Sequence, residues 1–82
     1  MTSHQAEGVT MALEVAVSDQ FGQRLRQIRK ARKMTQQTLA DAVGVPMQYI
    51  SRYENGDRKP SLMILEWLCT ALGITATELM GF

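Results

Sequence analysis

Apolar residues recur at helical spacing from about residue 18 to the end of this 82-residue chain. Phe21, Leu25 and Ile28 stand at i, i+4 and i+7, which places their side chains on one face of a helix. Ser or Thr precedes several of the apolar segments and Gly follows several, as is usual at helix N-caps and C-termini. The pattern predicts helices over about 18–33, 35–43, 46–55 and 61–72, with a short fifth helix from residue 75.

The N-terminal segment has a different period. Apolar and small or polar residues alternate over 8–17, with valine frequent, which is typical of a β-strand. The apolar positions are Val9, Met11, Leu13, Val15 and Val17. A single strand has no pairing partner in a helical domain, so two such strands, one from each of two chains, would satisfy each other. We therefore divide the chain into an N-terminal arm, 1–17, and a helical domain, 18–82.

The predicted helix over 61–72 has more apolar residues than one buried face needs. We expect Leu62, Leu65, Leu68, Cys69 and Leu72 to face the bundle. Met63, Ile64 and Trp67 then remain, which indicates burial on a second side. Our hypothesis is a homodimer interface formed by Val9, Met11, Leu13, Val15, Met63, Ile64 and Trp67. The alternative is that the arm folds back over its own chain.

Charge is unevenly distributed along the chain. The net charge is only +1, yet residues 20–60 contain all nine basic residues and three acids, a net of +6. Such a cluster is often only a solvated helix face. Because it coincides with two helices joined by a tight turn, we interpret it as an anion-binding surface.

Composition argues against other classes of protein. The chain has one histidine and one cysteine, and it has no phosphate-loop or nucleophile motif. We therefore expect neither an enzyme nor a metal or cofactor site. No apolar run is long enough to span a bilayer, so we expect no membrane partner. With a single cysteine and no secretory signal pattern, we expect a cytoplasmic protein.

Several motifs occur in order between residues 21 and 80. They are Leu25-x-x-Ile28-Arg29, Met34-Thr35-Gln36-x-x-Leu39-Ala40, Gly44-Val45, Ile50-Ser51-x-Tyr53-Glu54-Asn55-Gly56, Pro60 and Leu72-Gly73-Ile74. The ordered set resembles the XRE family of phage-repressor and Cro-like helix-turn-helix regulators. The resemblance implies an all-α, five-helix, lambda-repressor-like domain that binds operator DNA as a homodimer through its third helix.

The resemblance also implies roles for individual residues. Gln36 matches a position that contacts phosphate, while Gln48 and Arg52 match positions that contact bases. Arg29 and Glu54 match a structural ion pair between the first and third helices. Met47 stands where the family commonly has glutamine. It cannot form a hydrogen bond with a base edge, but it could pack on a thymine methyl group. For Tyr49, Arg58 and Lys59 we expect DNA contacts, with simple exposure as the alternative.

Two departures from the family pattern concern helix ends. Thr38 stands where an acidic residue would complete a capping box with Thr35, so that cap is half made. Lys33 stands where the family often has glycine; a left-handed conformation there would cost lysine about 1 kcal/mol.

The leading hypothesis from the sequence is a sequence-specific transcriptional regulator, a repressor or controller, that binds double-stranded DNA as a homodimer. The alternative is a protein-interaction module or an antitoxin-type protein that uses the same fold to bind a protein partner. The sequence does not distinguish a phage, restriction–modification or toxin–antitoxin setting.

Overall fold

Five helices make up most of residues 20–81, the part of the chain that the computed structural model describes. They are α2 (Phe21–Ala31), α3 (Gln36–Val43), α4 (Met47–Asn55), α5 (Leu62–Leu72) and α6 (Ala76–Met80). The all-α, five-helix prediction is confirmed. The predicted strand over 8–17, with its proposed interface residues Val9, Met11, Leu13 and Val15, lies outside the described residues.

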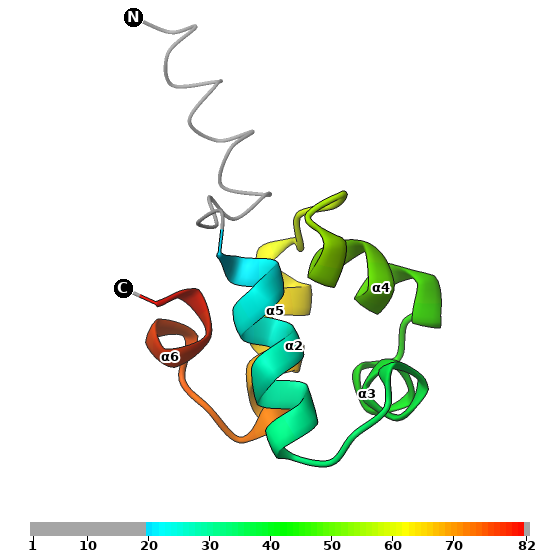
Figure 1. Ribbon diagram of the computed structural model, residues 1–82, viewed down its shortest axis with the longest axis horizontal. Helices are drawn as coiled ribbons and strands as arrows, with labels where there is room; N and C mark the ends of the chain where they lie inside the picture. Colours follow the sequence, from blue (N-terminus) through cyan, green and yellow to red (C-terminus); the bar gives the residue numbers. More distant parts are fainter. Residues whose placement is uncertain (1–19, 82) are drawn as a thin grey trace, which may run out of the picture.

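The helix α2 runs through the middle of the bundle. Figure 1 shows α3 and α4 on one side of it and α6 on the other, with α5 behind. The main contacts between helices are those of α2 with α4 and α6, of α3 with α4 and α5, and of α5 with α6. The residues buried between them include Phe21, Leu25, Leu39, Ala40, Ile50, Tyr53, Leu65, Leu68, Leu72 and Leu79. None of the helices in residues 20–81 has the length and apolar character needed to cross a membrane.

Side-chain caps begin three of the helices, as the sequence predicts. The Thr35 hydroxyl accepts a hydrogen bond from the Thr38 amide at 3.0 Å, and the Ser61 hydroxyl accepts one from the Ile64 amide at 3.2 Å. Thr75 and Glu78 form a complete capping box at α6. These bonds satisfy backbone donors that a helix start leaves unpaired. At α2 the residue before the helix is Gln20, whose side chain makes no cap bond.

Lys33, two residues after the end of α2, has a left-handed conformation, with φ of 57°. It is the only non-glycine residue with positive φ in residues 20–81. The following amide, Met34 N, donates to Arg29 O at 3.1 Å, which closes the end of the helix. Lysine thus adopts the conformation that glycine favours, at the cost of about 1 kcal/mol expected for a side chain there.

The buried face of α5 differs from the prediction at two positions. Leu62 is 51% exposed, whereas Ile64 is half-buried and packs against the core. Ile64, Leu68 and Leu72 form an i, i+4, i+8 row on the buried side of α5. Leu62 stands two positions before Ile64, so its side chain points to the opposite side of the helix. The apolar residues exposed on α5 are therefore Leu62, Met63 and Trp67, which we call the α5 apolar face.

Gly22 allows α2 to approach the end of α4 closely. A Cβ atom added at Gly22 would lie 2.5 Å from the carbonyl oxygen of Glu54 and 2.6 Å from that of Tyr53. Both neighbours are backbone atoms, so they cannot rotate away as a side chain would. The periodicity of the sequence gives no sign of this contact, because a single glycine in a helical segment has no distinguishing pattern.

We expect Gly22→Ala to lower the free energy of unfolding by about 1–3 kcal/mol, because the added methyl group must separate α2 from α4. Glycine to alanine in an unobstructed helix normally stabilises by about 0.5–1 kcal/mol, so the sign is diagnostic. Urea unfolding measures the change, with Gln23→Ala at the next, exposed position as control. A stabilised Gly22→Ala protein would contradict the close approach.

Candidate nucleic-acid interface

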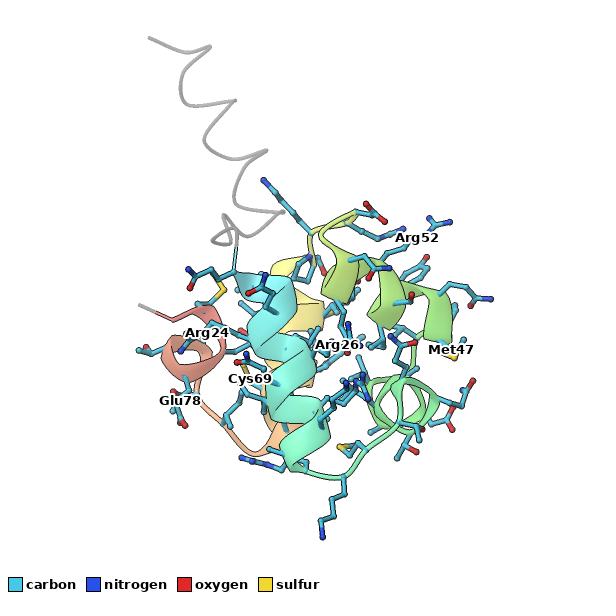
Figure 2. The ribbon with its side chains drawn as sticks, viewed as in Figure 1. Arg24, Arg26, Met47, Arg52, Cys69 and Glu78 are labelled. Carbon is cyan, nitrogen blue, oxygen red and sulfur yellow. The ribbon has the colours of Figure 1, made fainter. Side chains whose placement is uncertain are left out.

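The helix α4 has one buried and one exposed side. Ile50 and Tyr53 are inserted into the core, with 0% and 1% of their surface exposed. Gln48 and Arg52 are exposed and stand four residues apart, so they lie on the same face. Figure 2 shows Arg52 above α4 and Met47 at the first turn of the helix, toward α3, both on the side of the bundle away from α6. We call Met47, Gln48 and Arg52 the outer face of α4.

A buried ion pair fixes the position of α4 against α2. Arg29 Nε and Nη2 donate to the two carboxylate oxygens of Glu54, at 2.6 Å and 3.1 Å. The two side chains are only 9% and 2% exposed. The hydrogen bonding of Arg29 to the Glu54 carboxylate is the main cause that raises the pKa of Arg29 above its usual value. This two-bond geometry holds the two helices in one relative orientation.

The same carboxylate also binds α3. Gln36 Nε2 donates to Glu54 Oε1 at 3.1 Å, and Arg29 Nη1 donates to Met34 O at 2.8 Å, just before α3. The pair and its two partners therefore connect α2, α3 and α4, and we call the four residues the Arg29–Glu54 network. One of the two amide hydrogens of Gln36 is used inside the protein, and the other remains for an external acceptor such as phosphate.

Arg58 lies against an aromatic ring of α4. Its guanidinium carbon is 4.1 Å from the centre of the Tyr49 ring, and that ring meets Tyr53 edge-on at a centroid distance of 6.4 Å. Tyr49 is half-buried and packs against the core, so it is less exposed than the sequence suggested. Burial raises the pKa of Tyr53, and the nearby charge of Arg58 opposes that rise. This stacking was not predicted from the sequence.

An arginine of α2 and the arginine that directly follows this helix bind the ends of other helices. Arg32 Nε donates to Leu72 O, at the end of α5, at 2.8 Å. Arg24 Nη2 lies 3.5 Å from Glu78 O in α6, and Figure 2 shows Arg24 beside α6, on the side of α2 away from α4. Cations suit the negative ends of helices. The basic segment 20–60 therefore does not form one continuous anion-binding surface, which corrects our interpretation of its net charge.

The exposed basic residues of α4 and the loop that follows it are Arg52, Arg58 and Lys59. Cys69 is buried in α5, and burial raises the pKa of its thiol. Within residues 20–81, no group of three or more His, Cys, Asp or Glu side chains could hold a metal ion. The outer face of α4 and the loop after it present an amide, a thioether, two guanidinium groups and an ammonium group.

Comparison with known proteins identifies the family. Residues 25–79 match the family model described as helix-turn-helix. The chain belongs to this helix-turn-helix family. The resemblance to the phage-repressor and Cro-like class is thereby confirmed, together with the lambda-repressor-like fold.

Individual relatives agree with this assignment. The immunity repressor protein of Bacillus phage phi105 is 40% identical over 60 residues, which cover 73% of this chain and 42% of that protein. The restriction-modification controller protein C.AhdI of Aeromonas hydrophila is 43% identical, with a TM-score of 0.71 over 73% of this chain and 91% of that structure. SinR, the master regulator for biofilm formation, in complex with DNA, is 32% identical, with a TM-score of 0.69 over 72% and 95%.

We expect Arg29→Met and Glu54→Leu each to lower the free energy of unfolding by about 3–5 kcal/mol, because each leaves an uncompensated buried charge. The double variant should lose much less than the sum of the two, since it leaves neither charge. Urea unfolding of all four proteins measures this coupling. Strictly additive losses would show that the pair does not act as a unit.

Proposed function

We propose that this protein is a sequence-specific transcriptional regulator that binds operator DNA as a homodimer, with α4 in the major groove. The main observation is that the outer face of α4 is exposed while the Arg29–Glu54 network holds the helix from behind. The similarity to SinR bound to DNA and to a phage immunity repressor supports the proposal. Such a protein would act in the cytoplasm, where bacterial and phage operators lie, and would need no catalytic step.

The proposed base contacts come from the outer face of α4. Gln48 can bind adenine N6 and N7 with two hydrogen bonds, and Arg52 can bind guanine O6 and N7 in the same way. Met47, which is 36% exposed, has no donor for a base edge and can contact a thymine methyl group. Together these residues would distinguish two or three successive base pairs in each half-site.

The proposed phosphate contacts flank the outer face of α4 on both sides. At one side, the free amide hydrogen of Gln36 and the backbone N–H groups at the start of α3 can bind a phosphate. At the other side, Arg58 and Lys59 are exposed in the loop after α4. These contacts would set the position of α4 without selecting a sequence.

We further propose that the α5 apolar face forms the homodimer interface. Leu62, Met63 and Trp67 are 51%, 56% and 43% exposed, which is unusual for three large apolar residues on one short helix. Ile64 would contribute only its exposed edge, because it packs against the core. A symmetric dimer presents two copies of α4, as recognition of two half-sites requires. The alternating segment 8–17 would complete this interface.

Substitutions in the two kinds of contact should have different effects on DNA binding. Selection from a random DNA pool first provides the preferred duplex. Arg52→Ala should then weaken binding to that duplex by about 1–3 kcal/mol and relax the preference at one base pair. Lys59→Ala should weaken binding to the preferred duplex and to random duplexes alike. It should also lower the slope of log affinity against log salt concentration by about one, because one phosphate contact is lost. Equal losses on both duplexes for both variants would refute the division between base and phosphate contacts.

The dimer proposal predicts that a charge on the α5 apolar face separates the subunits. Met63→Glu should yield a monomer in analytical ultracentrifugation, because burial of an unpaired carboxylate in an apolar interface is strongly unfavourable. Gln23→Glu, which places the same charge at an exposed polar position of α2, should leave the dimer intact. If Met63→Glu remains a folded, tight dimer, the interface lies elsewhere.

A further inference from the structure

The contact between Arg58 and Tyr49 joins a loop to the helix before it. Arg58 is two residues past Gly56, whose left-handed conformation ends α4, and Tyr49 is nine residues earlier in the chain. The guanidinium carbon nevertheless lies only 4.1 Å from the Tyr49 ring centre. The loop is therefore folded back along α4, with its arginine over the ring.

The Tyr49 ring is itself well anchored. Tyr49 packs against the core and meets the buried Tyr53 ring edge-on at 76°. A ring fixed in this way is a rigid support, whereas a free arginine side chain in a loop samples many rotamers. Stacking therefore reduces the conformational freedom that Arg58 would otherwise lose on binding a ligand.

The stacked guanidinium keeps its binding capacity. Stacking uses the face of the planar group, and its N–H donors lie around the edge. No carboxylate in residues 20–81 forms an ion pair with Arg58, so its positive charge is not neutralised there. Arg58 is also exposed, unlike Arg29. These features are the ones required to bind a phosphate oxygen pair.

The ring lies next to the outer face of α4. Tyr49 directly follows Gln48 and is three residues before Arg52. A guanidinium held over this ring is thus close to the border of the proposed base-contacting face, where the DNA backbone would pass if α4 entered the major groove.

We propose that Tyr49 is a positioning residue that holds Arg58 for contact with a DNA phosphate. This inference rests on the proposed function and adds a specific role to it: Tyr49 acts through the face of its ring, and its hydroxyl is dispensable. Arg58 and Tyr49 together form one phosphate-binding unit, whereas Lys59 binds independently of Tyr49.

Tyr49→Phe and Tyr49→Leu separate the ring from the hydroxyl, because both lack the hydroxyl and only phenylalanine keeps the aromatic face. Dissociation constants for the selected duplex and a random duplex would be measured by fluorescence anisotropy. Each substitution is made in the wild-type, Arg58→Ala and Lys59→Ala proteins. Thermal unfolding is recorded for every variant.

We expect Tyr49→Phe to bind within about twofold of wild type and Tyr49→Leu to bind both duplexes about two- to fivefold more weakly, the usual size of an exposed cation–π contact. In the Arg58→Ala protein, Tyr49→Leu should cause no further loss. In the Lys59→Ala protein, its full effect should remain. If Tyr49→Leu acted by destabilising the fold in general, it would weaken DNA binding in the Arg58→Ala and the Lys59→Ala proteins alike.

Two results would overturn the inference. One is an equal loss from Tyr49→Leu with and without Arg58. The other is a loss from Tyr49→Phe as large as that from Tyr49→Leu, which would indicate that the hydroxyl contacts DNA.

Nuclear magnetic resonance of the free protein separates this inference from the proposed function. The Arg58 side-chain protons should be shifted upfield by the ring, and Tyr49→Leu should remove that shift. DNA binding without the shift would refute the positioning role alone. The shift without any DNA binding by wild type would refute the proposed function, and with it the phosphate role of Arg58.

Discussion

The buried ion pair of Arg29 and Glu54 determines the orientation of α4, the second helix of the helix-turn-helix motif, relative to the rest of the bundle. Its hydrogen bonds, with those of Gln36 and Met34, join α2, α3 and α4 at one point. Buried ion pairs contribute little net stability compared with apolar packing of the same volume, so we infer that this pair serves to hold α2 and α4 in one arrangement. Gly22 acts at the same place, because it lets α2 contact the carbonyl groups at the end of α4. A shift of either contact would redirect the outer face of α4.

Most of the fold could be predicted from the sequence because its determinants are local. Thr35, Ser61 and the Thr75–Glu78 box cap the helices that their positions predict, and Lys33 adopts the conformation that its place after α2 requires. The prediction failed for Leu62 and Ile64, which exchange their expected environments. Which side of an apolar helix is buried depends on neighbouring helices, and an all-round apolar sequence leaves that choice open.

The candidate site was predicted less completely. Periodicity and the family pattern placed Gln48 and Arg52 on one exposed face, and the structure agrees with that placement. The bond between Gln36 and Glu54 and the stacking of Arg58 on Tyr49 could not be derived, because each joins residues from different segments. Charge was misleading for a related reason: Arg24 and Arg32 belong to the basic segment but bind the ends of α6 and α5. Net charge along a sequence does not show which side chains are already occupied.

A titration of the isotopically labelled protein with its selected duplex, followed by amide chemical shifts, tests directly whether the surface around α4 binds DNA. The changes should be concentrated in the first turns of α4 (Met47–Asn55), at Gln36 and in the loop that contains Arg58 and Lys59. The amides of α6 (Ala76–Met80), on the other side of α2, should remain unchanged. Shifts centred on α6, or a saturable titration that leaves α4 unaffected, would contradict the proposed binding surface.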